Sequence, residues 1–455
     1  MGKVVMEDLK IKVEAPFAVY PAETKAARSM FLSNIDQTLV APVGTLSFFS
    51  APPTMTFQEV VDSYVKALSQ MLVTYDFMAG RLKLNEEEDR LEIECNGAGA
   101  FFAVASTDLT MDDLGDIATP NLAFRRFVLC DYVALSHQQP HLPLFTLQAT
   151  RFKCGGFVVG AGLNHCILDG ISCFHMMINL ASIAMGKGLP ITPFVDRALL
   201  KARDPPTIAY QHNEYSKISE LPPTLTLTAN FSGRGKDVTA SAAHMAEAQE
   251  EENVLKLFSL SGEAIERLKE KGAEEGWKCS SFEVVTALVW KARMAAVEDE
   301  DDEIATVLFP MDVRSKIEPA LPKEYAGNAV IPGHARASVK EVRDEALGVL
   351  VRKVQEGLRR INDDYVRSML DWLEVNKGIP CAVRSFSVVA WWKLGMDQVQ
   401  FPWGKPLHLG PVIFSHSQDL VLLLPHHHGH GLNIVIALLP SQMSKFERIL
   451  PLLLD

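Results

Sequence analysis

Cysteine is sparse in this chain, and the spacing of the cysteines indicates neither disulfide pairs nor a metal-binding motif. The 455 residues include seven cysteines, an odd number, and no two of them stand in a Cys-x-x-Cys spacing. This usage argues against a disulfide framework and is typical of reduced thiols. We therefore expect a cytoplasmic protein.

Long apolar runs and an excess of basic charge are also missing. No stretch reaches the roughly 18 apolar residues of a membrane-spanning helix, no signal-peptide pattern opens the sequence, and the apolar tail 449–454 is too short to span a bilayer. Lys and Arg number 44 against 56 Asp and Glu, a net charge of −12. We expect no membrane span and no nucleic-acid partner.

The composition is that of a folded protein with more than one unit. Apolar residues make up 48% and charged residues 22%, which argues against disorder, and the length predicts two or three domains. Strand-like and helix-like segments alternate up to about residue 190, as in a mixed α/β layer. We expect an N-terminal domain over 1–191, a proline-rich crossover loop over 192–252 and a C-terminal domain over 253–455. Whether a segment near 381–405 packs with the N-terminal domain is left open.

Several local elements can be predicted from periodicity. Residues 56–75 show helical spacing of apolar residues, and 91–95 alternate like a strand. Ser261 is a suitable N-cap for a helix over 263–271. The acidic run 298–303 predicts a solvated loop.

The most informative stretch is Asn164–Gly170, which contains His165 and Asp169 four residues apart. Residues 157–163 read as a buried strand, and 171–185 read as a helix. A histidine at a strand end, before a loop and a helix, can face a cleft while rigid backbone holds it. Neutral imidazole titrates near physiological pH, so His165 is a candidate general base.

Other kinds of site were weighed against this one. His165, Cys166, Cys173 and His175 fit no common zinc spacing. The histidine-rich segment 425–431 is more suggestive of metal, but we expect a polar turn between strands 420–424 and 432–438 with adventitious affinity. No G-x-S-x-G elbow, Walker loop or dinucleotide fingerprint occurs. We therefore predict no metal site.

Further segments along the whole chain, in order, resemble the plant BAHD acyltransferases, which move an acyl group from coenzyme A to an alcohol or amine. These segments are Leu32–Asp36, Ala79–Leu82, Cys95–Gly99, His165–Gly170, Asp312–Arg314, Tyr325–Asn328 and Phe401–Pro406. The resemblance implies an α/β fold of two chloramphenicol-acetyltransferase-like domains with mixed β-sheets, joined by a long crossover loop, with an active-site channel at the interface. It also implies acyl-CoA as co-substrate, no permanently bound cofactor and a monomer.

The same resemblance implies roles for individual residues. His165 is the general base, and Asp169 is a structural carboxylate that pairs with Arg314 instead of relaying charge. Trp391 helps to stabilise the oxyanion, although Val389 stands where the family has a threonine. Further structural support is implied from Gly170, Phe401, Trp403 and Gly404, although Gln400 and Pro402 depart from the family pattern here.

Five residues are implied to contact coenzyme A. Ser259, Ser261 and Lys269 belong to the segment that meets its phosphates, and Ser281 and Ala287 to the segment that lines its arm. Lysine and serine suit a phosphate. Lys269 is equally well explained as an exposed helix charge, and both explanations stay open.

Three more segments resemble the branch that acylates ω-hydroxy fatty acids and fatty alcohols; they are Gln37, Asp196–Pro206 and Tyr365–Met369. We expect transfer of a hydroxycinnamoyl group (feruloyl, caffeoyl or coumaroyl) to a long-chain aliphatic hydroxyl, chemistry that belongs to suberin and cutin. One alternative is a shikimate-like acceptor, another polar alcohol or an amine, for which Arg384 is a candidate pocket residue. An alternative of another class is a non-catalytic partner of fatty-acid elongation enzymes.

Overall fold

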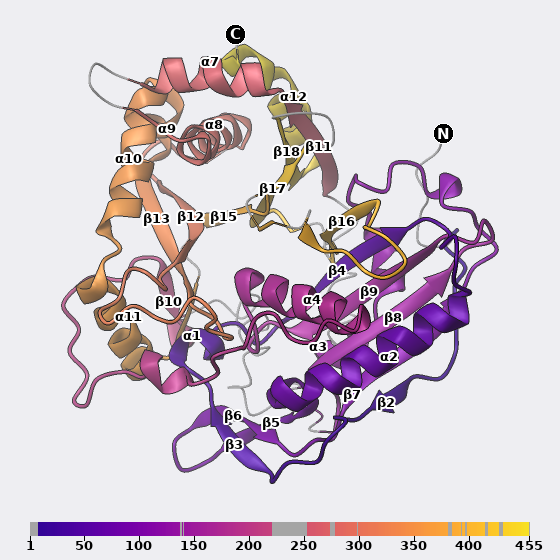
Figure 1. The fold of residues 1–455 in the computed structure, drawn as a ribbon. Helices are drawn as coiled ribbons and strands as arrows, with labels where there is room; N and C mark the ends of the chain where they lie inside the picture. Colours follow the sequence, from indigo (N-terminus) through magenta and orange to yellow (C-terminus); the bar gives the residue numbers. More distant parts are fainter. Residues whose placement is uncertain are drawn as a thin grey trace.

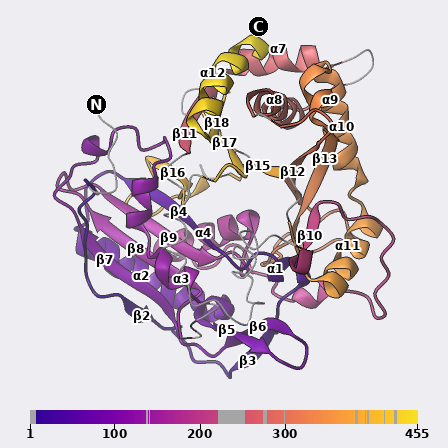
Figure 2. The ribbon, with the colours of Figure 1, turned by 180° about the vertical axis from the view of Figure 1, so that it is seen from behind.

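The computed structural model describes most of the chain and shows two halves, each built on a β-sheet. In Figure 1 the first half runs from indigo to magenta, and the second half, in orange and yellow, lies above it. Figure 2 shows the same arrangement from behind. The residues described are 8–136, 139, 141–220, 253–273, 278–297, 299–380, 385–392, 394–395, 398–414, 417–426 and 431–454.

The sheet of the first half has the strand order β1-β7-β8-β9-β4-β16, with β2 also paired to β7. Only β7 and β8 run parallel, so the sheet is mixed. Its strands are β1 (Lys12–Val13), β2 (Phe17–Val19), β4 (Pro42–Phe49), β7 (Ala100–Ser106), β8 (Phe145–Arg151), β9 (Phe157–Asn164) and β16 (His408–Pro411).

Two long helices pack on this sheet and bury its larger apolar face. They are α2 (Phe57–Thr74) and α4 (Gly170–Ala184), and both contribute to one core together with β8 and β9. Helix α2 begins at a capping box in which Thr56 and Glu59 exchange hydrogen bonds. The predictions of a helix over 56–75 and of a strand followed by a helix around His165 are confirmed.

Shorter elements complete the first half. A small antiparallel sheet has the order β3-β6-β5, and its middle strand confirms the strand predicted over 91–95. The bounds are β3 (Arg28–Phe31), α1 (Asn34–Gln37), η1 (Asp76–Ala79), β5 (Arg81–Asn85), β6 (Arg90–Cys95), η2 (Asp112–Leu114), η3 (Leu122–Phe127) and α3 (Cys130–Ala134).

The sheet of the second half has the order β11-β18-β17-β15-β12-β13, with β15 parallel to both β12 and β17. Helix α8 (Ser281–Ala296) is buried along most of its length, and Figure 1 shows it enclosed by α7, α9, α10 and α12. The other bounds are β11 (Val254–Leu260), α7 (Gly262–Gly272), β12 (Ile304–Asp312), β13 (Val330–Ser338), α9 (Val339–Asp344), α10 (Leu347–Arg360), β15 (Ser385–Ala390), β17 (Leu420–Pro425), β18 (Leu432–Leu438) and α12 (Pro440–Leu454).

The predicted crossover is anchored over the part that the structure describes. Strand β10 (Tyr215–Lys217) pairs with β14 (Gly378–Pro380), and Tyr215 shares a core with α11 (Asp363–Asn376). Two single turns, η4 (Arg197–Leu200) and η5 (Ile218–Glu220), belong to the same stretch. Residues 221–252 lie outside the described residues, and the boundaries at 191 and 253 stay a prediction.

One strand crosses from the second half of the chain to the first sheet. Strand β16 pairs antiparallel with β4, so that residues 408–411 extend a sheet otherwise built from residues 12–164. Phe401 and Trp403 enter the same core from the segment just before it. Within the described ranges, no helix is both long and apolar enough to cross a membrane.

Candidate active site

His165 follows β9 directly and stands before the N-terminus of α4, as predicted. Its backbone N–H donates to the carbonyl of Ala41 at 2.8 Å, and its side chain is half-buried. The backbone of the residue is therefore fixed by the edge of the sheet, while the imidazole keeps an accessible side.

Asn328 fixes the proton of the His165 ring. The Asn328 Nδ2 atom donates to a carboxylate oxygen of Asp36 and to the His165 carbonyl, both at 2.8 Å. Because both partners only accept, the Asn328 Oδ1 atom must face the ring, where it lies 3.2 Å from Nδ1. The neutral ring therefore carries its proton on Nδ1 and leaves the lone pair of Nε2 available.

Asp36 and Arg197 form a fully buried ion pair behind this contact. Arg197 Nη1 lies 3.2 Å from Asp36 Oδ1, and both side chains are 0% exposed. Burial opposes the charge of Arg197, but Asp36, together with the nearby Tyr325 and Cys166 side chains, raises the pKa of the guanidinium nonetheless. Arg197 also donates to the carbonyls of Cys166 and Ile167, the two residues after the histidine.

Asp169 and Arg314 form a second ion pair on the other side of the same loop. Their closest atoms, Asp169 Oδ2 and Arg314 Nη2, are 2.9 Å apart, which confirms the predicted pairing. Asp169 also accepts from the backbone N–H groups of Ser172 and Ala329. Burial opposes the charge of Arg314, and Asp169 with Asp312 raises the pKa of its guanidinium nonetheless.

The residues predicted as structural support occupy two places. Phe401 and Trp403 stack at 4.9 Å and lie against Tyr64 of α2, so they belong to the first core. Gly404 has φ of +125°, a conformation that favours glycine. A methyl group on Gly170 would meet Leu394 only at an ordinary 3.5 Å, so space alone does not require glycine there.

Trp391 lies at the end of β15, on the sheet face opposite the helices. It is held by a 2.8 Å hydrogen bond from its backbone N–H to Leu423 and packs with Leu422, Leu424 and Val435. Val389 contacts the same cluster. Among the described residues, no hydrogen bond or ring contact joins Trp391 to His165, and its oxyanion role stays a prediction.

The residues predicted to meet coenzyme A are dispersed around α7 and α8. Ser259 donates to Asn433 at 2.7 Å, Ser261 is the N-cap of α7 as predicted, and Lys269 pairs with Glu266. Ser281 opens α8. Ala287 is 0% exposed inside the second core, which corrects the expectation that its side chain lines the ligand arm: a fully enclosed methyl group has no surface to offer.

No metal centre is formed by the part of the chain that the structure describes, where no three His, Cys, Asp or Glu side chains are grouped suitably for one. His427, His428 and His430 of the predicted histidine turn lie outside the described residues. Strands β17 and β18 flank that segment at the predicted positions. The six described cysteines are free thiols.

Three residues of the site had no role assigned from the sequence. Asp36, Arg197 and Asn328 each stand in a segment with family resemblance, yet they are separated by more than a hundred residues. The only sequence signal for these three residues is that each is a charged or amide residue within a segment that is otherwise apolar or turn-forming. The structure brings all three together behind His165.

Comparison with known sequences identifies relatives over nearly the whole chain. A sequence model of the Transferase family matches residues 9–450. Acyltransferase GLAUCE from Arabidopsis thaliana is 39% identical over 98% of this chain and 96% of its own length. The Omega-hydroxypalmitate O-feruloyl transferase of the same plant is 30% identical over 96% of this chain and 92% of its own.

Solved structures show the same architecture. The crystal structure of vinorine synthase aligns with a TM-score of 0.72, covering 98% of this chain and 99% of that chain. The two sequences are 18% identical, so this likeness concerns the fold alone. It confirms the predicted fold class, two sheet-centred α/β halves with mixed strand directions.

Proposed function

Because this chain belongs to the plant BAHD acyltransferases, we propose that it moves a hydroxycinnamoyl group from coenzyme A to a long-chain aliphatic hydroxyl. The acceptor is a fatty alcohol or an ω-hydroxy fatty acid. The fixed tautomer of His165 carries the mechanistic part of the proposal. The acceptor class is supported by the relative named for ω-hydroxypalmitate and by the resemblance of Gln37, Asp196–Pro206 and Tyr365–Met369 to that branch.

His165 acts twice in this mechanism. Its Nε2 lone pair takes the proton of the acceptor hydroxyl while the oxygen attacks the thioester carbonyl carbon. When the tetrahedral intermediate collapses, the carbon–sulfur bond breaks and Nε2 returns the proton to the leaving thiolate. The imidazolium formed between these steps is stabilised through Nδ1–H, which donates to Asn328. No covalent acyl-enzyme is needed.

The oxyanion and the donor are assigned to other residues. Trp391 offers an indole N–H for the oxyanion, and Val389 adds no side-chain donor. Ser259, Ser261, Lys269 and Ser281 contact coenzyme A, whereas Ala287 is buried and has no surface to offer it. A cation and hydroxyl donors suit phosphate groups in a chain whose overall charge is negative.

Turnover of feruloyl-CoA with hexadecanol, ω-hydroxypalmitate and shikimate tests the proposal. We expect activity with the two aliphatic acceptors and a loss of about 10²–10⁴-fold in His165→Ala. His175→Ala removes a half-buried histidine of α4 and serves as the matched control. Equal activity of His165→Ala and the native enzyme would overturn the base assignment. Transfer to shikimate alone would favour the polar-acceptor alternative, and no turnover with any acceptor would favour the non-catalytic partner.

A further inference from the structure

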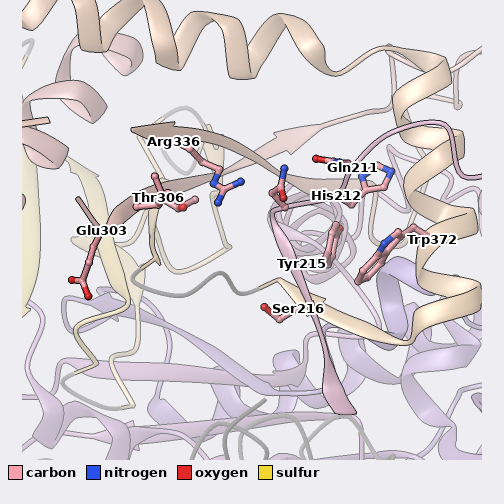
Figure 3. Close-up of a pocket in the computed structure, with 10 residues that line it drawn as sticks. Gln211, His212, Tyr215, Ser216, Glu303, Thr306, Arg336 and Trp372 are labelled. Atoms are coloured by element: carbon pink, nitrogen blue, oxygen red, sulfur yellow. The ribbon is translucent and has the colours of Figure 1, made fainter. Parts of the chain in front are cut away.

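A polar cavity of about 440 Å³ lies apart from the residues assigned to the mechanism. It forms where the segment around β10 meets α11 and the outer end of the β12–β13 pair. Figure 3 shows Arg336 and Thr306 on one side of it, and Tyr215 and Trp372 on the other. His212 and Glu303 also line it.

Two of its polar groups have no protein partner. The side chain of Thr306 belongs to a residue only 1% exposed, and its hydroxyl makes no hydrogen bond. Arg336 is an exposed residue that forms no ion pair with a described carboxylate, and in Figure 3 its guanidinium points into the space between the two walls. A buried hydroxyl without a partner is unfavourable, so a ligand that accepts from Thr306 and also pairs with the neighbouring guanidinium is favoured.

Two other polar side chains that line the cavity are already engaged. The two ring nitrogens of His212 contact Glu214 and Ser368. The Glu303 carboxylate accepts from the Glu300 backbone N–H and points away from the guanidinium in Figure 3. The Arg336 guanidinium and the Thr306 hydroxyl therefore remain as donors, and the amides of Gln211 and Asn213 line the same cavity. A guanidinium beside neutral hydrogen-bond donors suits a carboxylate.

A half-exposed strip of β15 leads from this cavity toward Trp391. Ser385 is the register partner of Thr306 in the parallel pair of β15 and β12. Ser385, Ser387 and Val389 are each half-buried, whereas Phe386 and Val388 between them point into the second core. Trp391 lies six positions after Ser385, a span of roughly 20 Å along an extended strand.

We propose that the cavity binds the carboxylate of an ω-hydroxy fatty acid through Arg336 and Thr306, while the chain lies along β15 and its hydroxyl reaches His165. This inference rests on the proposed function, because that function places Trp391 beside the reacting carbonyl. It adds a residue that separates ω-hydroxy acids from simple fatty alcohols, since only the acids carry an anion at the far end.

The kinetic test replaces Arg336 and compares two acceptors of equal chain length. In Arg336→Gln we expect KM for ω-hydroxypalmitate to rise at least tenfold with kcat little changed, and KM for hexadecanol to stay constant. Thr306→Val should raise KM for the acid a few-fold. Arg448→Gln, which neutralises an exposed arginine of α12, is the control. Equal effects on acid and alcohol, or no effect on either, would overturn the proposal.

Chain length and binding without turnover complete the test. The chain of ω-hydroxyoctanoate is too short to bridge the cavity and His165, so Arg336→Gln should leave its KM unchanged, and an equal rise would refute the bridging geometry. Calorimetry with palmitate separates the two proposals. Binding that weakens at least tenfold in Arg336→Gln supports the carboxylate site even if no acyl transfer occurs, whereas absent or unaltered binding refutes it.

Discussion

Two buried ion pairs hold the loop that carries His165, and they differ in the number of carboxylates that contact the arginine. Arg197 has Asp36 as its only carboxylate partner among the described residues, and both side chains are 0% exposed. Arg314 has Asp169 and also the partly exposed Asp312, each at 2.9 Å. If Asp36 is removed, no other described carboxylate pairs with Arg197, whereas Asp312 still pairs with Arg314 if Asp169 is removed.

The two pairs also act on different parts of the loop. Asp36 orients Asn328, which fixes the His165 ring, and Arg197 holds the two carbonyls that follow. Asp169 caps α4 and ties it to the backbone of Ala329, which directly precedes β13 in the second half. Asp169, although part of the recognisable motif, therefore supports the loop, while Asp36 acts on the His165 ring through Asn328.

Removing the irreplaceable anion should have the largest effect. Asp36→Ala leaves the guanidinium of Arg197 buried without a counter-charge, and we expect the free energy of unfolding to fall by about 3–5 kcal/mol. Urea unfolding followed by tryptophan fluorescence measures this loss. In the double variant Asp36→Ala/Arg197→Met, stability should recover in large part while activity stays low, because Asn328 remains without its acceptor. A loss under about 1 kcal/mol in the single variant would contradict the comparison.

The matched change on the other side should cost less. Asp169→Ala removes the N-cap of α4 and one partner of Arg314, but Asp312 remains, so we expect a loss of about 2–3 kcal/mol. The same unfolding assay gives the value. Asp169→Ala/Asp312→Ala removes the reserve anion as well and should approach the cost of Asp36→Ala. Equal losses of unfolding free energy in the single and double Asp169 variants would show that Asp312 does not compensate the charge of Arg314.

A third buried carboxylate, that of Glu214, differs from the other two because its partners are the histidines His212 and His334 and not an arginine. Burial, reinforced by Arg360, outweighs the attraction of Glu214 and lowers the pKa of His334 to about 4. An unfolded histidine has a pKa near 6.5, so between these values the unfolded state binds the extra proton. Stability should therefore be intact above about pH 6.5 and fall by on the order of 2–3 kcal/mol as pH drops to 4.

The pH dependence of unfolding in His334→Asn checks this assignment. Asparagine keeps a donor for Glu214 but does not titrate, so the slope of unfolding free energy against pH should decrease between pH 4 and 6.5. An unchanged slope would assign the acid sensitivity to other groups.

The smallest effect is expected at Asn328, where the change concerns orientation. Asn328→Ala removes the acceptor of Nδ1–H, and one such hydrogen bond corresponds to about a tenfold fall in kcat. KM for acyl-CoA and acceptor should stay within a factor of two, since Asn328 is 0% exposed and its amide is engaged by Asp36 and His165. A rise in KM with constant kcat would show that Asn328 binds substrate and does not position the base.

Local periodicity predicts the helices and strands around the site, but it cannot predict contacts between residues that are far apart in the sequence. Strand β9, helix α4 and the cap at Ser261 follow from neighbouring residues, so they could be read from the sequence. The pairing of Asp169 with Arg314 was implied by family resemblance. The cluster of Asp36, Arg197 and Asn328 depends on segments far apart in the chain, and no spacing rule reports their proximity.

The same limit explains the errors and omissions in the second half. Ala287 was assigned to a ligand arm because its segment resembles one, yet helical position turns its side chain into the core. The carboxylate cavity requires the register of β12 with β13 and β15 together with the docked crossover. Arg336 lies in a strand that contains no recognisable motif, so nothing in the sequence marks it as a ligand-binding residue.

Strand β16 has a consequence for any attempt to divide the protein. A fragment that ends before residue 408 would leave the outer edge of β4 without its partner, exposing unpaired backbone groups beside Leu46 and Phe48. Such an edge recruits other strands, so the first half expressed alone should self-associate. Supplying a synthetic peptide that spans residues 401–414 should restore a dispersed fragment, as a missing strand complements an incomplete sheet.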